Sequence, residues 1–186
     1  TVTFSATTVA QRTICEGGNY VVSSANATNF SSLNWSTSGD GTFISGAATL
    51  TPTYRPGTLD KANGSVILKL NAEKNTPCPA DAEDSIQLII TKNPVITVVN
   101  SSLDICAGTA VPITGPGVYF GIQADNFDEL RWTSSGNGVF TNTLPTNIAT
   151  PNSYTPSAAD IAAGSVILTL KASRTALNCN SLTTQA

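Results

Sequence analysis

Short runs in which apolar and polar side chains alternate recur along the chain. In SVILKL, which begins at Ser65, a large apolar residue occupies every second position, and SVILTL from Ser165 repeats this pattern. A period of two indicates a β-strand with one buried face. Further strands of five to eight residues are predicted at YVVSS, SSLNWST, SIQLII and VITVVN. No segment has the apolar period of a helix of ordinary length, so the pattern predicts an all-β protein.

The strand pattern occurs twice, in two collinear halves of the chain. ATNFSSLNW (Ala27–Trp35) matches ADNFDELRW (Ala124–Trp132), at an offset of 97 residues. Self-similarity at a fixed period predicts a tandem duplication of one small domain. The boundary is expected near TKNPV, which gives domains 1–93 and 94–186. The linker is short and has no Gly/Ser-rich stretch, so we expect a semi-rigid rod.

Each repeat also carries one short helical signal. In PSAADIAAG, Ser157 stands at an N-cap, Asp160 three residues later, and Gly164 at the stop, which predicts a single capped turn. The first repeat keeps Asp60 but has Gly57 in place of the serine. We therefore expect its turn to be less well capped.

The most distinctive duplicated stretch is NWSTSGDGTF from Asn34, matched by RWTSSGNGVF from Arg131. Asp-Gly and Asn-Gly are dipeptides of tight hairpins, because both residues tolerate positive φ. The stretch therefore predicts a hairpin that leaves the tryptophan strand. The exchange of Asp40 for Asn137 fits a turn better than a calcium site, which needs several carboxylates.

About seven short strands per repeat, one of them bearing a tryptophan, predict two tandem immunoglobulin-like antiparallel β-sandwiches. The tryptophans occupy equivalent mid-strand positions and are expected to fill the two cores. The aromatic residues expected in the cores are Trp35, Phe43 and Tyr54, with Trp132, Phe140 and Tyr154.

Composition limits the functions that such domains can have. Only 11% of the 186 residues are charged, the net charge is −3, and no basic cluster exists, so no nucleic-acid partner is expected. A neutral polar surface is typical of extracellular β-proteins. The chain has no 18-residue apolar run that could insert into a membrane, and no Met, so we expect a piece of a processed or larger protein. We expect this fragment to be monomeric.

Four cysteines, Cys15, Cys78, Cys106 and Cys179, are spread without the C-x2-C spacing of zinc sites. We expect these cysteines to form disulfides in an oxidising compartment. Repeat symmetry favours pairing Cys15 with Cys78 and Cys106 with Cys179. The alternative is a link between neighbouring repeats, because Cys15 and Cys78 belong to loops at opposite ends of a standard sandwich.

An enzyme is not expected. The chain has no His, which removes Ser-His-Asp and Cys-His catalysis. Two acidic clusters could in principle cleave glycosides, but they differ between the repeats and are interpreted as solvated loops; they are Asp81, Glu83 and Asp84, and Asp125, Asp128 and Glu129. No D-x-D-x-D-G motif occurs, so neither a metal nor another cofactor is predicted.

The second repeat has additional residues in PGVYFGIQ (Pro116–Gln123). Tyr119 and Phe120 are the candidate contact residues of this loop, because sugars stack on exposed aromatic rings. The loop is expected to pack against a neighbouring repeat, and binding of a surface polysaccharide is the alternative.

The order C-x-G, L-x-W-x-T/S-S-G-D/N-G-x-F, Y-x-P and D-x-x-x-G-S-V-x-L-x-L occurs in both repeats. It resembles the Ig-like or PKD-like repeats of very large Bacteroidota surface proteins, among them the gliding-motility adhesins. The resemblance implies export by the type IX secretion route to the bacterial cell surface. It also implies a non-enzymatic spacer whose partners are the neighbouring repeats of the same chain. A polysaccharide-binding module, acting through Tyr119 and Phe120, and an accessory domain of a secreted polysaccharide hydrolase are the alternatives.

Overall fold

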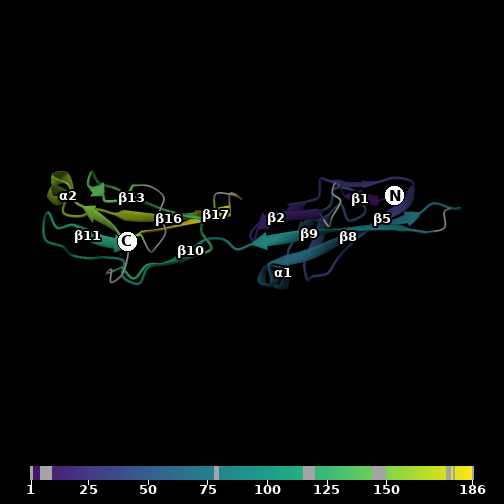
Figure 1. Ribbon diagram of the computed structural model, residues 1–186, viewed down its shortest axis with the longest axis horizontal. Coiled ribbons are helices and arrows are strands. Elements are labelled where there is room, and N and C mark those ends of the chain that lie inside the picture. Colours follow the sequence, from purple (N-terminus) through teal and green to yellow (C-terminus); the bar gives the residue numbers. More distant parts are fainter. Residues whose placement is uncertain are drawn as a thin grey trace. The chain divides into compact units, whose positions relative to one another are not determined.

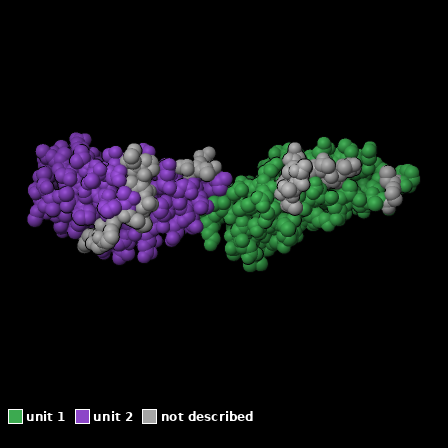
Figure 2. Space-filling model, in the orientation of Figure 1, with its two compact units in different colours: residues 1–92 green, residues 93–186 purple. Residues whose placement is uncertain are grey.

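The computed structural model of the chain describes residues 2–4, 10–77, 80–114, 120–143, 150–174, 177 and 179–185. The chain divides into two compact units, unit 1 (Thr1–Lys92) and unit 2 (Asn93–Ala186), which are coloured separately in Figure 2. None of the helices in these described ranges is long and apolar enough to span a membrane.

Unit 1 is a β-sandwich with one short helix (Figure 1). Its elements are β1 (Val2–Phe4), β2 (Ala10–Cys15), β3 (Tyr20–Val21), β4 (Ala25–Ala27), β5 (Phe30–Thr37), β6 (Thr42–Ser45), β7 (Thr53–Arg55), α1 (Thr58–Asn63), β8 (Ser65–Lys74) and β9 (Ala82–Thr91). One sheet has the order β2-β9-β8-β5, the other has the order β3-β7-β6, and β1 pairs with β4. Strand β2 lies parallel to β9, whereas the other described pairs are antiparallel.

Unit 2 has a similar architecture, but its sheet with the tryptophan strand has three strands among the described residues, whereas that of unit 1 has four. Its elements are β10 (Val95–Thr97), β11 (Val111–Thr114), β12 (Gln123–Asp125), β13 (Glu129–Ser134), β14 (Val139–Phe140), β15 (Asn152–Thr155), α2 (Ala158–Ala163), β16 (Leu168–Arg174) and β17 (Cys179–Gln185). The sheets have the orders β13-β16-β17 and β11-β15-β14, and β10 pairs with β12. The predicted fold class, two tandem immunoglobulin-like β-sandwiches, is confirmed.

Alternation along the strands builds one core in each unit. In β8 the side chains of Val66, Leu68 and Leu70 point inward and are buried, and Ile67 between them is exposed. The tryptophan strands β5 and β13 show the same alternation. Full burial of one such side chain stabilises the fold by about 1.5–3 kcal/mol relative to leaving it exposed. The alternation of apolar and polar residues therefore determines which face of each strand is turned toward the core.

The duplicated Gly-Asp-Gly and Gly-Asn-Gly stretches do not form hairpins, and this prediction is wrong. Strand β5 pairs with β8, while β6 pairs with β7 in the other sheet. The loop from Ser38 to Gly41 therefore crosses from one sheet to the other. Neither Gly39 nor Gly41 has a positive φ. A tight-turn conformation is therefore not the reason for glycine at these positions.

Candidate functional site: a buried carboxylate in each unit

One aspartate in each unit lies in the interior, at the third position of the short helix. Asp60 in α1 is 1% exposed and Asp160 in α2 is 6% exposed, and no other charged side chain among the described residues is buried. A carboxylate loses much hydration on burial and needs hydrogen-bond donors in compensation. Its partners therefore identify the segments that it holds together.

In unit 1 the carboxylate of Asp60 accepts four hydrogen bonds. Its Oδ2 accepts from the Tyr54 hydroxyl at 2.6 Å and from the backbone N–H of Gly57 at 3.0 Å. The backbone N–H groups of Asp40 and Gly41 donate to the same carboxylate at 3.2 and 3.1 Å. Asp60 thus joins the β5–β6 loop, strand β7 and the start of α1. We call this set of contacts the carboxylate hub.

Unit 2 has the same hub with one contact rearranged. Asp160 accepts from the Tyr154 hydroxyl at 2.8 Å and from the backbone N–H groups of Ser157 and Asn137, both at 2.9 Å. The Gly138 N–H, which is equivalent to that of Gly41, donates to the tyrosine hydroxyl at 3.0 Å. The motif residues that align in sequence therefore meet at the same place in both folds.

The hub explains the glycines of the duplicated loop. A Cβ on Gly39 would overlap the carboxylate of Asp60, and a Cβ on Gly136 would overlap that of Asp160. A Cβ on Gly41 would overlap the Tyr54 side chain. Glycine is needed here for close approach of backbone to carboxylate. Sequence reasoning assigned these glycines to a turn and missed the hub. The shared aspartate, tyrosine and glycine positions were its only signal.

The two helices are capped by different residues, so the prediction that α1 is less well capped is wrong. The Ser157 hydroxyl accepts from the Asp160 N–H at 3.1 Å and caps α2. In unit 1 the Asp40 carboxylate, from the β5–β6 loop, accepts from the Leu59 and Asp60 N–H groups at 3.0 and 3.1 Å. The hydrogen bond from the Leu59 N–H is the main cause of a pKa of Asp40 below its usual range.

Hydrogen bonding and burial also shift the pKa values of three residues of the hubs, Asp160, Tyr54 and Tyr154. The backbone N–H groups of Ser157 and then Asn137 lower the pKa of Asp160 to about 2. Burial, followed by the hydrogen bond to Asp60, raises the pKa of Tyr54 to about 12. Burial is also the main cause of the raised pKa of Tyr154. At neutral pH the hub of unit 2 therefore pairs an ionised aspartate with a protonated tyrosine.

The carboxylates of both hubs accept hydrogen bonds from protein donors, so the hub holds segments of each unit in place. The part of the chain that the structure describes contains no group of three His, Cys, Asp or Glu residues placed to hold a metal ion. In the first acidic cluster Glu83 pairs with Lys69 at 2.5 Å, and Asp81 accepts from the Lys74 N–H at 3.0 Å. In the second, Asp128 lies 3.8 Å from Arg174.

The aromatic residues of the repeat pack beside the hub. Trp35 is buried and its Nε1 donates to the Thr49 carbonyl at 2.9 Å. The Phe43 ring lies between those of Trp35 and Tyr54, with centroid distances of 5.8 and 5.1 Å. In unit 2, Trp132 is buried and the Phe140 and Tyr154 ring centroids are 4.9 Å apart. Aromatic pairs at this spacing add to the stability from burial.

The contact-loop prediction is wrong for Phe120, because that side chain is 4% exposed and belongs to the core of unit 2. A ring buried in this way cannot stack on a sugar. Tyr119 lies outside the described residues.

The symmetric disulfide pairing of Cys106 with Cys179 is also wrong. Cys106 carries a free, exposed thiol, whereas Cys15 and Cys179 are disulfide-bonded. Cys78 lies outside the described residues.

No family model and no curated protein match the chain. Solved structures of protocadherin extracellular domains do match. The cis-dimer structure of domains 3–6 of protocadherin gammaB7 is 16% identical over 98% of this chain and 46% of that one, with a TM-score of 0.43. Domains 3–6 of protocadherin Gamma B2 are 16% identical over 100% of this chain and 46% of that one, with a TM-score of 0.41.

The chain thus spans less than half the length of these structures. At these identities and scores the likeness does not extend to function. The structure itself defines the class: two tandem immunoglobulin-like repeats, each organised around a buried aspartate.

The two capping arrangements predict a compensating pair in unit 1. A Cβ on Gly57 would overlap Asp40, so Gly57→Ser alone should destabilise unit 1 by about 1–3 kcal/mol. Asp40→Asn alone should also lower the stability of unit 1, because an amide nitrogen cannot accept one of the two hydrogen bonds that the Leu59 and Asp60 N–H groups donate to the carboxylate. The double variant reproduces the residues of unit 2 and should recover stability, with a coupling of about 1 kcal/mol in urea unfolding.

The reciprocal pair in unit 2, Ser157→Gly with Asn137→Asp, is the matched control for this swap. Additive losses in both units would show that the two capping arrangements are independent of each other.

The lowered pKa of Asp160 predicts acid sensitivity of unit 2. A carboxyl group with a folded pKa of about 2 and an ordinary unfolded value of about 3.9 stabilises the fold above about pH 4. This contribution should disappear as the pH falls from about 4 through 2. Urea unfolding of a Trp35→Phe background, in which Trp132 reports on unit 2, measures the effect. Asp160→Asn should be less stable at pH 7 and flatter between pH 4 and 2; an unchanged slope would contradict the assignment.

Proposed function

We propose that the chain is a non-enzymatic structural module, a semi-rigid spacer of tandem repeats in a large adhesin of a bacterial cell surface. The observation that carries the proposal is the duplicated carboxylate hub. The residues shared by the two repeats, including the aspartate, the tyrosine and the two loop glycines, contact one another inside each unit. What the duplication preserves is therefore the means of holding a sandwich together.

The extracellular, exported setting is supported by two properties of the chain. Only 11% of residues are charged, so Thr, Ser and Asn cover much of the surface. Cys15 and Cys179 are disulfide-bonded, which requires an oxidising compartment in most organisms. The motif order shared with Ig-like and PKD-like repeats of Bacteroidota surface proteins supports an adhesin of the gliding-motility type and the type IX secretion route.

The spacer role implies that the neighbours of each repeat are other repeats of the same protein, and that adhesion is performed elsewhere in the adhesin. A module of this kind supplies length and resistance to unfolding. Burial of Phe120 removes one of the two rings on which a polysaccharide-binding role was based. For these reasons the spacer is favoured over a carbohydrate-binding module.

Single-molecule pulling tests the spacer role. Under reducing conditions, the chain should unfold in two events, each releasing roughly 300 Å of extended chain for about ninety residues. Asp60→Asn should lower the force of one event and Asp160→Asn that of the other. A glycan array run with the same protein should show no binding. Saturable capture of a polysaccharide by the wild-type chain would overturn a role limited to spacing.

We further propose that the disulfides of Cys15 and Cys179 are one bond that links the two repeats, as in the alternative pairing. The free thiol of Cys106 supports it, because the pairing within the second repeat is excluded. Peptide mapping without reduction should recover the Cys15 and Cys179 fragments joined, with Cys106 alkylated. In Cys15→Ser the Cys179 thiol should become reactive, whereas Cys106→Ser should change nothing. Recovery of Cys15 joined to Cys78 would refute this pairing.

A further inference from the structure

Asparagine followed by glycine is a chemically labile pair. The backbone nitrogen of the glycine can attack the side-chain carbonyl carbon of the asparagine. A cyclic imide forms, and the proton of the glycine N–H leaves with the side-chain amino group as ammonia. Water then opens the imide to aspartate or isoaspartate. Glycine favours the attack because it has no Cβ to hinder the approach. The chain has two such pairs, Asn63–Gly64 and Asn137–Gly138, and both asparagines are exposed.

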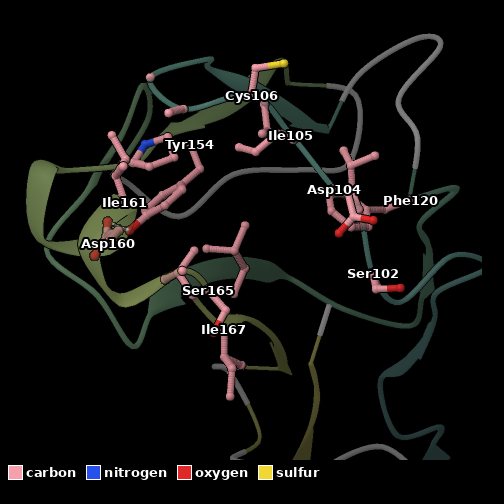
Figure 3. Close-up of a pocket in the computed structure, with 18 of the residues that line it drawn as sticks. Ser102, Asp104, Ile105, Cys106, Phe120, Tyr154, Asp160, Ile161, Ser165 and Ile167 are labelled. Atoms are coloured by element: carbon pink, nitrogen blue, oxygen red, sulfur yellow. Dashed lines mark hydrogen bonds between the residues drawn. The ribbon is translucent and has the colours of Figure 1, made fainter.

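The hub of unit 2 restrains Asn137 through the backbone on both sides of its side chain. The Asn137 N–H donates to the Asp160 carboxylate at 2.9 Å, and the Gly138 N–H donates to the Tyr154 hydroxyl at 3.0 Å. That hydroxyl donates in turn to Asp160 (Figure 3). Imide formation needs the proton of the Gly138 N–H to leave and the backbone to rotate. Both steps break hydrogen bonds of the hub, so the closed hub opposes the reaction.

The side chain of Asn137 is not restrained in the same way. It is exposed, and no described residue forms a hydrogen bond with its amide group. The equivalent Asp40 of unit 1 differs, because its carboxylate accepts from the Leu59 and Asp60 N–H groups. The Leu59 hydrogen bond is the main cause of the lowered pKa of Asp40, which keeps that side chain ionised. An ionised carboxylate resists attack by a nucleophile, so the loop of unit 1 is protected by its chemistry as well as by the hub.

The other labile pair, Asn63–Gly64, lies at the end of α1. The Gly64 N–H donates to the backbone carbonyl of Asp60 at 2.9 Å, a hydrogen bond of the helix end and not of the hub carboxylate. Unit 2 has Ala163 in place of this asparagine. An Asn-Gly pair therefore occurs in the hub loop of unit 2 alone, and Asn63 is a reference within the same molecule.

The product of the reaction does not fit the hub of unit 2. In unit 1 the Asp40 carboxylate occupies the space that a Cβ on Gly57 would need. Ser157 has that Cβ in unit 2, so a new aspartate at position 137 cannot take the same place. Its charge would lie beside the carboxylate of Asp160, to which its own backbone N–H is bonded, and like charges repel. Isoaspartate would instead lengthen the backbone by a carbon atom, in a loop where a Cβ on Gly138 would already overlap its neighbours.

We propose that Asn137–Gly138 is a deamidation site held in check by the hub of unit 2, so that opening of the hub starts an irreversible change of the repeat. The closed hub keeps the Gly138 N–H bonded to Tyr154. In the open hub this nitrogen is free to lose its proton to hydroxide and to attack the side chain, and water completes the reaction. The aspartate or isoaspartate that forms prevents the hub from closing with its original geometry. The rate of the reaction therefore follows how often the hub opens.

Replacement of the hub tyrosine tests the proposal. The full chain and its Tyr154→Phe and Tyr54→Phe variants are incubated in mildly alkaline buffer, and peptide mapping by mass spectrometry follows deamidation at Asn137 and Asn63. Tyr154→Phe removes the acceptor of the Gly138 N–H and should speed the deamidation of Asn137 about tenfold or more. The rate at Asn63 should not change in this variant. Tyr54→Phe, the matched control, alters the hub of unit 1 and should leave the Asn137 rate as it is.

An unchanged Asn137 rate in Tyr154→Phe would overturn the proposal, as would an equal acceleration by Tyr54→Phe. If Tyr154→Phe is not recovered folded, the wild-type chain is incubated at a series of urea concentrations below the unfolding transition. Hydrogen exchange of the Gly138 amide and deamidation of Asn137 should then rise in proportion, because both need the same opening. A deamidation rate that stays constant while exchange rises would also count against the site.

The effect of the product on the fold is tested with Asn137→Asp, which has the residue that deamidation creates. Asn137→Gln is the matched control, because it keeps a neutral amide and cyclises far more slowly through a larger ring. In urea unfolding, Asn137→Asp should have the lower midpoint for unit 2. Equal midpoints in the two variants would show that the reaction does not weaken the repeat.

Discussion

The need to satisfy a buried carboxylate governs the local structure of both units. Asp60 and Asp160 lie in the interior, and backbone N–H groups and a tyrosine hydroxyl supply the hydrogen bonds that compensate each carboxylate for its lost hydration. Other donors come from the loop that follows the tryptophan strand, 20 residues before Asp60 in the case of Asp40 and 23 residues before Asp160 in the case of Asn137. The loop glycines, the tyrosine of β7 or β15 and the capped helix turn are all consequences of that one requirement.

Strand periodicity and the repeat were readable from the sequence because each depends on local pattern. Leu68 alternates with Lys69, and the Trp35 and Trp132 motifs align at a fixed offset. The hub was not readable, because it depends on the contact of Gly39 with Asp60, which local rules assign separately to a turn and a cap. The predictions for Phe120 and Cys106 were wrong for a related reason, because a sequence pattern does not show which side of a loop faces the core.

The two units satisfy the same geometry with different residues. In unit 1 a loop carboxylate, Asp40, caps the helix across a glycine; in unit 2 the helix provides its own cap at Ser157, and Asn137 takes the loop position. The effect of a substitution at the loop position therefore depends on which residue occupies the N-cap position, and the reverse also holds. This is why the exchange of Asp for Asn, which looked like simple turn tolerance, carries structural information.

The crossing of the β5–β6 loop between sheets has a mechanical consequence. Tyr54, in one sheet, bonds both to Asp60 and to Thr37 at the end of β5 in the other sheet, at 2.6 and 2.9 Å. Sliding of one sheet over the other would therefore pull the Tyr54 hydroxyl away from Thr37 or from the buried carboxylate of Asp60. The hub therefore opposes shear between the two sheets of unit 1, which is the resistance that the proposed spacer role requires.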